Sequence, residues 1–477
     1  MNIAERAQCI DTVVIGGGHA GLCMSYVLQH EGREHVVLEK ARALEQWRSA
    51  RWDSFRTNSP IAYLRLIGQV DGLPDTRRSI PLGEMIRMWD EYITQRRFPI
   101  REWSKVLSVT RTDEGRFTVC VECDHGPQRY DALNVVAAPG NYQFPRVPSF
   151  AKYLGPEIQQ LRVGTYSKPS AIQAGAILVV GGGQTGMQLS EELAGAGRDV
   201  YLATSKVKGT PRDYRGEDVM FWLDRIGILT APKEKCGYPE DRDRMPIVGH
   251  DHSISHHSLA RLGVRLSGRL KDISRDGATA IFRDDVHANI MFAQRGYDKL
   301  IDQIENWIAG VDPTVRGRYP LPTTEPAWEP HPPLLASAPP TSLSLREHGI
   351  RAVVWATGWL TDLGWLRINE VRQTLDSCGL PDACETAVDG FYWLGFDGLR
   401  TCASGTVAGF HLDAAHIATR LRRGTGQKPR PVTTSMSSSK IASSEPLPRT
   451  IPTPPITSSP VPPQGTRTRP ATQATTR

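Results

Sequence analysis

Apolar residues gather in short runs that end in glycine, and apolar residues at helical spacing follow each run. The first run, residues 13–15, stops at a glycine triplet, and the helical spacing continues to Leu28. The same order recurs over residues 176–193. A short continuous apolar run is typical of a buried parallel strand, and the spacing after it is typical of an amphipathic helix. The chain therefore predicts an α/β fold with two strand–turn–helix units.

Other stretches predict further elements of this fold. The expected elements are an amphipathic helix over residues 80–97, strands at 106–109, 117–121, 133–137 and 350–355, and a last helix that starts near Ser404. Residues 312–340 are rich in proline, which predicts an irregular connector.

The first glycine turn carries the pattern G-x-G-x-x-G. In this pattern the first glycine makes the turn, the second lets the backbone approach a pyrophosphate, and the third lets the helix pack on the strand. The next strand ends at an acidic residue, which is expected to hold a ribose hydroxyl. The residues expected to bind this first dinucleotide, FAD, are Gly16, Gly18, His19, Ala20, Gly21, Glu39 and Lys40.

The second glycine turn has the same pattern but lacks the acid. Its next strand, Val200–Ala203, runs into Thr204-Ser205-Lys206. A missing carboxylate and a nearby lysine favour a ribose that bears a 2′-phosphate, so NADPH is expected here, with Arg212 and Arg215 as further candidate phosphate ligands. The other residues expected to bind it are Gly181, Gly183, Gln184, Thr185, Gly186, Ser205 and Lys206. Two such nucleotides in one chain indicate a flavoprotein in which hydride passes between them.

The loop after the first nucleotide strand carries bulky side chains with polar tips, namely Trp47, Arg51, Trp52 and Arg56. Loops that follow the strands of such sheets form the ligand crevice, so this loop is expected to line the flavin or the nicotinamide. Weaker candidates, for the substrate pocket, are Phe221, Trp222, Phe391, Trp393 and His411.

The last residues differ in composition from the rest. From residue 424 onward there is no aromatic residue, and Ser, Thr and Pro dominate, which predicts a disordered tail. This tail holds seven basic residues and one acidic residue, a surplus equal to the net charge of +6 for the whole chain. The body is therefore neutral, and no nucleic-acid partner is expected.

Four histidines, at positions 250, 252, 256 and 257, lie close together. The two adjacent ones would diverge, and no cysteine or distant carboxylate completes a ligand set, so no metal is expected. No apolar signal-peptide core precedes the first strand and no window is apolar enough to span a membrane, so the expected location is cytoplasmic.

Several segments together resemble a known family. GGGHAG with its following Glu39, RWDSFRTNSP, AAPGNYQFP, GGGQTG and VVWATGW resemble the flavin-containing (class B) monooxygenase superfamily, most closely its CzcO-like flavoproteins. The resemblance covers nearly all of residues 10–423. It implies two Rossmann-like dinucleotide-binding domains of the three-layer ββα type. The implied divisions are 1–165 and 331–423 for FAD, an inserted NADPH domain at 166–330, and the disordered tail at 424–477.

The resemblance also implies an activity. NADPH would reduce FAD, O2 would form a C4a-(hydro)peroxyflavin, and one oxygen atom would pass to a small-molecule substrate. Asn58 matches the catalytic asparagine near the flavin edge, and Trp47 matches the tryptophan that follows the ribose acid. Thr357 and Gly358 belong to the ATG strand end, where a cofactor contact is implied.

One motif of that family is missing. Its linker histidine should precede the second glycine turn, but the two possible registers place Gln159 or Arg162 there. Two alternatives therefore stay open: an NADPH oxidase or reductase that oxygenates no substrate, and a non-enzymatic, transport-associated flavoprotein that senses redox state.

Overall fold

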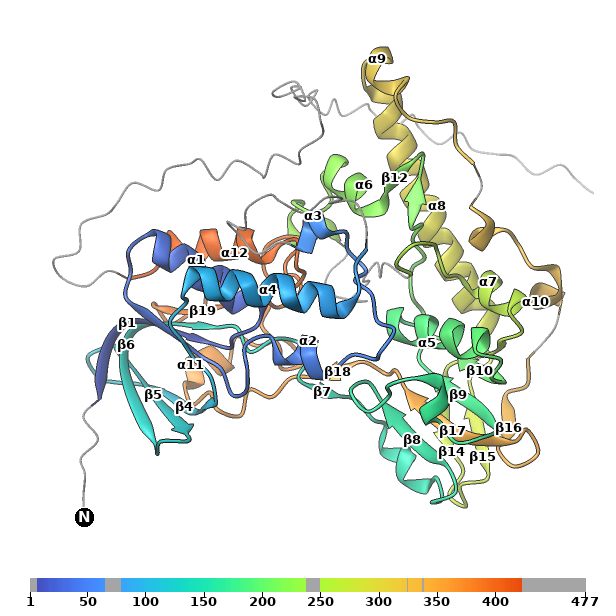
Figure 1. Ribbon diagram of the computed structural model, residues 1–477, viewed down its shortest axis with the longest axis horizontal. Coiled ribbons are helices and arrows are strands. Elements are labelled where there is room, and N and C mark those ends of the chain that lie inside the picture. The colour runs from blue at the N-terminus through green and yellow to red at the C-terminus, as the bar shows by residue number, and fades with distance from the viewer. Residues whose placement is uncertain (1–6, 65–78, 237–248, 324, 337–338, 423–477) are drawn as a thin grey trace, which may run out of the picture. The chain divides into compact units, whose positions relative to one another are not determined.

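The computed structural model describes residues 7–64, 79–236, 249–323, 325–336 and 339–422 (Figure 1). The predicted disordered tail lies outside these residues. Among the described helices, none is both long and apolar enough to cross a membrane.

The first sheet has seven strands and contains the first glycine turn. Its order is β3-β2-β1-β6-β5-β4, and β19 pairs with β6. Strand β1 is parallel to β2 and to β6, whereas β4, β5 and β6 form an antiparallel meander. The strands are β1 Gln8–Ile15, β2 His35–Leu38, β3 Ile100–Arg101, β4 Ser104–Arg111, β5 Phe117–Cys123, β6 Gln128–Ala137 and β19 Phe391–Trp393.

Helices cover the parallel part of this sheet. Helix α1 (His19–His30) packs against α12 (Phe410–Ala418), and the apolar side chains of α4 (Leu82–Arg96) join the same core (Figure 1). Val13, Val14 and Val37 are fully buried there, which is why the strands read as continuous apolar runs. Short helices α2 (Glu45–Ser49), α3 (Ile61–Leu64) and α11 (Asn369–Arg372) lie in the connecting loops.

The second sheet contains the second glycine turn, and all five of its strands are parallel, in the order β13-β10-β9-β17-β8. Its elements are β8 Gln159–Arg162, β9 Ala176–Val180, α5 Gln184–Gly195, β10 Val200–Ala203, α7 His256–Arg261, β13 Arg265–Ser267 and β17 Ile350–Trp355. A three-stranded antiparallel sheet adjoins it, formed by β14 (Leu270–Ile273), β15 (Thr279–Phe282) and β16 (Ser342–Ser344).

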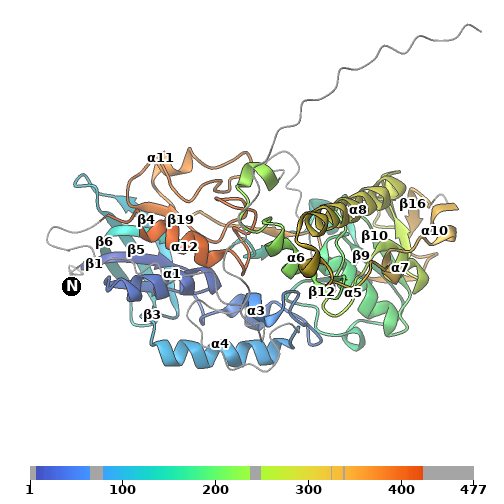
Figure 2. The same ribbon diagram turned by 90° about the horizontal axis from the view of Figure 1, so that it is seen from above.

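The long helix α8 (Val286–Gly310) packs against α6 (Val219–Arg225), as Figure 2 shows from above. Before α6 lies a short ribbon of β11 (Asp213–Tyr214) and β12 (Glu217–Asp218). The predicted irregular connector holds α9 (Pro313–Arg316) and α10 (Pro332–Ala336), with single-turn 3-10 helices here and elsewhere in the chain.

The chain passes to the second sheet and returns through two paired strands. Strand β7 (Phe144–Pro145) is antiparallel to β18 (Trp359–Leu360). Beside them, Arg146 N donates to Gly358 O at 2.8 Å, and the Thr357 hydroxyl donates to Arg146 O. The α/β fold with two strand–turn–helix units, one inserted into the other, is confirmed. Strands β8 and β17 extend the second sheet beyond the predicted limits of 166 and 330.

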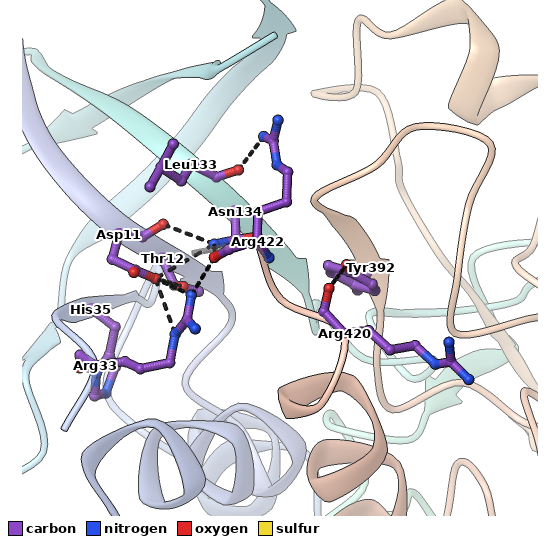
Figure 3. Close-up of polar contacts among 9 residues, drawn as sticks. All are labelled: Asp11, Thr12, Arg33, His35, Leu133, Asn134, Tyr392, Arg420 and Arg422. Atoms are coloured by element: carbon purple, nitrogen blue, oxygen red, sulfur yellow. Dashed lines mark hydrogen bonds and ion pairs between the residues drawn. The ribbon is translucent and has the colours of Figure 1, made fainter. Parts of the chain in front are cut away.

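The described chain ends in a polar anchor on the first sheet (Figure 3). Arg33 and Asp11 form a buried ion pair at 2.7 Å. The side chain of Asn134 accepts from Arg422 N at 2.8 Å and donates to Arg422 O at 3.0 Å, and Arg33 Nη2 donates to the same carbonyl at 2.6 Å. Tyr392 Oη donates to Arg420 O at 2.6 Å. Residues 420–422 are therefore fixed to strands β6 and β19, and through Arg33 and Asp11 to β1.

Most predicted elements are present, with one clear difference. The last helix begins at Phe410 and not near Ser404. Turns occupy residues 402–409, because Gly405 has a φ of +84° and Gly409 leaves no room for a Cβ beside the backbone of Ala403.

Candidate functional site

The three glycines of the first turn are required for three different reasons. Gly16 has a φ of +105°, and a Cβ there would lie within 3.0 Å of the Ala138 carbonyl oxygen. A Cβ at Gly21 would meet the Gly16 carbonyl oxygen, so the third glycine lets α1 pack closely on the turn. At Gly18 a Cβ would meet nothing within 4 Å. That space lies at the start of α1, where a ligand can approach the backbone.

The start of α1 suits an anion. The first N–H groups of a helix have no acceptor within it, and the helix dipole adds a partial positive charge there. Gly18 is the N-cap of this 12-residue helix and supplies no side-chain acceptor. A phosphate can therefore take the place of a capping side chain.

Glu39 closes the same turn. Its carboxylate accepts from Gly17 N at 2.7 Å and from Ala41 N at 3.0 Å. Burial raises the pKa of Glu39, while these two backbone donors act in the opposite direction. The neighbouring Lys40 ammonium lies 5.3 Å from the ring centre of Phe144. The acid predicted to hold a ribose hydroxyl is thus held in place by the glycine turn itself.

The second turn repeats this geometry. Gly181 has a φ of +119° and abuts the Ala356 carbonyl, Gly186 abuts the Gly181 carbonyl, and Gly183 faces open space. Gly182 N donates to Ser205 Oγ at 3.1 Å, just as Gly17 N donates to Glu39. An uncharged hydroxyl therefore stands where the first turn has a carboxylate. The Lys206 ammonium lies 4.6 Å from the ring centre of Phe292.

The first turn and the start of α5, the helix that follows the second turn, border one cavity of about 1290 Å³, which we call the central cavity. A drug-sized ligand fills a pocket of about 300–1,000 Å³, so this cavity can take more than one such ligand. Of the predicted site residues, those that line it are Gly16, Gly18, His19, Ala20, Glu39, Lys40, Trp47, Asn58, Gln184, Thr185 and Gly358. Gly21, Gly181, Gly183, Gly186, Ser205, Lys206 and Thr357 do not line it.

His19 is a buried, neutral part of the cavity wall. Its ring packs edge-on against Trp89, with 5.3 Å between the ring centres, and against Phe410 of α12 at 5.5 Å. Neither ring nitrogen has a hydrogen-bond partner in the described part of the chain. Burial, with a smaller contribution from His411, lowers the pKa of His19 to about 3.

Asn58 connects the two halves of the cavity. Its Oδ1 accepts from Gln188 Nε2 of α5 at 2.6 Å, and its backbone carbonyl accepts from Arg212 Nη1. With Oδ1 engaged, the Nδ2 group is the part of this amide that can donate to a ligand.

Some predicted contacts are wrong. Arg212 is buried and forms an ion pair with Asp218, and Arg215 pairs with Glu305 at 2.7 Å, so neither is free to bind a phosphate.

None of the five weaker pocket candidates lines the central cavity. Trp222, Phe391 and Trp393 are core residues. Within the loop, Arg51 and Trp52 line the cavity, whereas Arg56 does not.

Sequence reasoning missed several cavity residues. Gln188 lies four positions after Gln184 on α5 and so on the same helix face, a spacing that could have revealed it. Lys208, Lys299 and residues 402–408 also line the cavity, but no sequence signal marks them. Across the described ranges, no group of three or more His, Cys, Asp or Glu residues could hold a metal ion.

Comparison with known proteins finds oxidoreductases among the proteins that this chain resembles. The family described as "Pyridine nucleotide-disulphide oxidoreductase" matches residues 13–225. An uncharacterized CzcO-like oxidoreductase of Geobacillus kaustophilus is 26% identical over 418 residues, which cover 86% of this chain and 97% of that protein. The chain is therefore similar over most of its length to oxidoreductases of the CzcO type, and its first half is similar to the pyridine nucleotide-disulphide oxidoreductases.

Solved structures of flavin-dependent monooxygenases share the fold of this chain. A flavin-containing monooxygenase from Stenotrophomonas maltophilia has a TM-score of 0.58 at 17% identity, covering 86% of this chain and 98% of its own. The structure of OTEMO in complex with FAD and NADP has a TM-score of 0.50 at 15% identity. The match covers 87% of this chain and 85% of the OTEMO chain.

Proposed function

We propose that this protein is an FAD-dependent, NADPH-consuming monooxygenase that inserts one oxygen atom from O2 into a small molecule. The observation that supports it is that two matching glycine turns lead to one cavity, which the first turn and the start of α5 after the second turn both border. Two dinucleotides that share a cavity can exchange hydride, and a monooxygenase, unlike a sensor of one nucleotide, needs both.

The first turn fits FAD. Gly18 leaves open space at the start of α1 for the pyrophosphate, and Glu39 can accept from a ribose hydroxyl. His19 and Trp47 would border the rest of the cofactor. Burial keeps the His19 imidazole neutral near pH 7, so it can both donate and accept a hydrogen bond there.

The second turn fits NADPH. Gly183 leaves the start of α5 open for the pyrophosphate, and Ser205 replaces the acid that would repel a 2′-phosphate. Gln184 and Thr185 line the cavity at the start of the same helix. Lys206 would add positive charge beside that phosphate.

When bound, FAD supplies hydride acceptance and the activation of O2. The chain supplies orientation: Asn58 would offer Nδ2 as a donor, because Gln188 occupies its Oδ1. Both residues border the cavity from different halves of the molecule. The bond between them would therefore hold this donor in place at the cavity wall.

The test begins with anaerobic addition of NADPH to the purified flavin-containing protein. We expect the flavin absorbance to bleach, faster with NADPH than with NADH. On admission of isotopically labelled O2 with methyl phenyl sulfide as the probe, we expect one labelled oxygen atom in the product. Hydrogen peroxide equal to the NADPH consumed, without oxygenated product from sulfide, amine or ketone probes, would identify an oxidase. If neither NADPH nor NADH bleaches the flavin, both the monooxygenase and the oxidase activity are contradicted.

A further inference from the structure

Arg51 places a positive charge in the wall of the central cavity without a matching negative charge among the residues that the structure describes. It follows α2 and is half-buried. Its guanidinium carbon lies 4.7 Å from the ring centre of Trp47 and 5.3 Å from that of Phe55. Nη1 donates to Ala50 O at 2.7 Å. No carboxylate among the described residues pairs with it, unlike Arg48, which pairs with Asp90.

The backbone holds this side chain in position. Immediately after Arg51, Asp53 N donates to Ser167 O at 2.9 Å, and Phe55 N donates to Trp52 O at 3.0 Å. Trp47 in turn packs against Trp89, with 5.5 Å between the ring centres. The guanidinium therefore lies between fixed aromatic faces, and most of its five N–H groups remain available to a ligand.

A cation that is partly withdrawn from water without a counterion is costly, and this burial lowers the pKa of Arg51 to about 10. An anionic ligand would compensate it. The nucleotide phosphates already have their own positions at the open starts of α1 and α5, beside Gly18 and Gly183. The anion at Arg51 is thus expected to be a different one.

We propose that Arg51 binds the carboxylate of the substrate, and that the central cavity takes organic acids with an aromatic or apolar body. A planar guanidinium matches a carboxylate with two parallel hydrogen bonds. Trp47, Trp52 and Phe55 provide apolar surface for the rest of the molecule. This inference names the substrate class of the proposed monooxygenase and rests on that function.

The probe is benzoate, compared with its uncharged analogue benzamide, titrated into the flavin-containing protein. Binding is followed by intrinsic tryptophan fluorescence, because Trp47 and Trp52 lie in the cavity wall. We expect wild-type protein to bind benzoate at least tenfold more tightly than benzamide. Arg51→Met should weaken benzoate binding by about 10- to 100-fold, as expected for a charge-assisted pair, and leave benzamide binding unchanged.

Two further variants separate charge from geometry. Arg51→Lys keeps the charge without the planar fork, so we expect an intermediate loss and a protein that folds even if Arg51→Met does not. Arg42→Met is the matched control, because Arg42 belongs to the same loop, is exposed and already pairs with Glu45 at 2.8 Å.

Three results would overturn the inference: equal binding of benzoate and benzamide by wild type, unchanged benzoate binding by Arg51→Met, or a loss that falls on NADPH and not on benzoate. The fluorescence readout requires no turnover. Arg51-dependent benzoate binding without NADPH-driven bleaching would therefore contradict the proposed function alone, whereas bleaching without benzoate selectivity would contradict only this inference.

Discussion

The neighbours of each glycine in the first turn differ, so substitutions there should separate folding from cofactor binding. Gly16 and Gly21 face protein backbone, whereas Gly18 faces open space and has an extended backbone with φ of −76°. A methyl group at Gly18 would meet the ligand and not the protein.

We therefore expect Gly18→Ala to fold with a melting temperature near that of wild type but to lose FAD affinity by about 10- to 100-fold, as for overpacking of 1–3 kcal/mol. Gly16→Ala should instead misfold or lose several kcal/mol, because its Cβ would collide with the Ala138 carbonyl. The ratio of flavin to protein absorbance and thermal unfolding measure the two effects. Full flavin content in Gly18→Ala would contradict the assignment.

Two buried histidines should make the protein sensitive to acid. Burial lowers the pKa of His19 to about 3 and that of His256 to about 4, whereas both would titrate near 6.5 in the unfolded chain. Between these values the unfolded chain binds protons that the folded chain does not. The free energy of unfolding should therefore decrease as the pH is lowered below 6.5, by up to about 1.4 kcal/mol per pH unit for each histidine.

Urea unfolding at pH 7, 6 and 5 tests this expectation. His256→Leu should flatten the pH dependence, and the exposed control His30→Gln should not. The hypothesis fails if His256→Leu and wild type lose stability in parallel. Above pH 6.5 neither buried histidine contributes to the pH dependence.

At the scale of elements, the contact between α5 and Asn58 joins the two nucleotide-binding halves. Gln188 donates to Asn58 Oδ1, and the ion pair of Arg212 with Asp218, which caps α6, holds the Asn58 backbone. The orientation of a residue beside the flavin turn thus depends on the helix that starts at the other turn.

Gln188→Leu should leave FAD content unchanged but slow NADPH-dependent flavin reduction by about tenfold, because the Asn58 amide loses its orientation. In Gln188→Glu the new carboxylate can only accept a hydrogen bond. The Asn58 amide should therefore turn so that Nδ2 donates to it and Oδ1 faces the cavity, with a similar loss of the reduction rate. Anaerobic stopped-flow absorbance measures the rate. The control Glu191→Gln changes the same helix where it contacts His252. Equal rates in wild type and both Gln188 variants would exclude the positioning role.

Local patterns explain what the sequence could predict at this scale. The glycine turns and helix α4 depend on neighbours within a few residues, and their spacing was readable. The membership of β8 and β17 in the second sheet depends on pairing between segments almost 200 residues apart, which periodicity does not encode. Arg212 was mistaken for a phosphate ligand because a loop arginine does not reveal its burial or its partner Asp218.

For the whole molecule, the polar anchor of Figure 3 fixes residues 420–422 to the first sheet. A chain that ends at Arg422 keeps the bonds from Asn134 and Arg33, and the composition of residues 424–477 predicts a tail without a core. Its stability should equal that of the full chain within about 1 kcal/mol, the size of one hydrogen bond.

A chain that ends at Thr419 loses the hydrogen bonds that Arg420 and Arg422 make in the anchor, and also the buried Leu421. We expect it to lose about 3–6 kcal/mol of the free energy of unfolding. Urea unfolding of both truncated chains and the full chain provides the measurement. Equal stability of the two truncated chains would show that the anchor contributes nothing.

The pairing of β7 with β18 has a consequence for how such a protein can be assembled from modules. The strand that leaves the first sheet and the strand that returns to it are neighbours in space, so the entry and exit of the second unit meet at one point. Residues 146–358 can therefore be inserted or removed as one segment, with a short turn joining β7 to β18. What would remain is a one-nucleotide domain whose strands, helices and closing anchor are all still present.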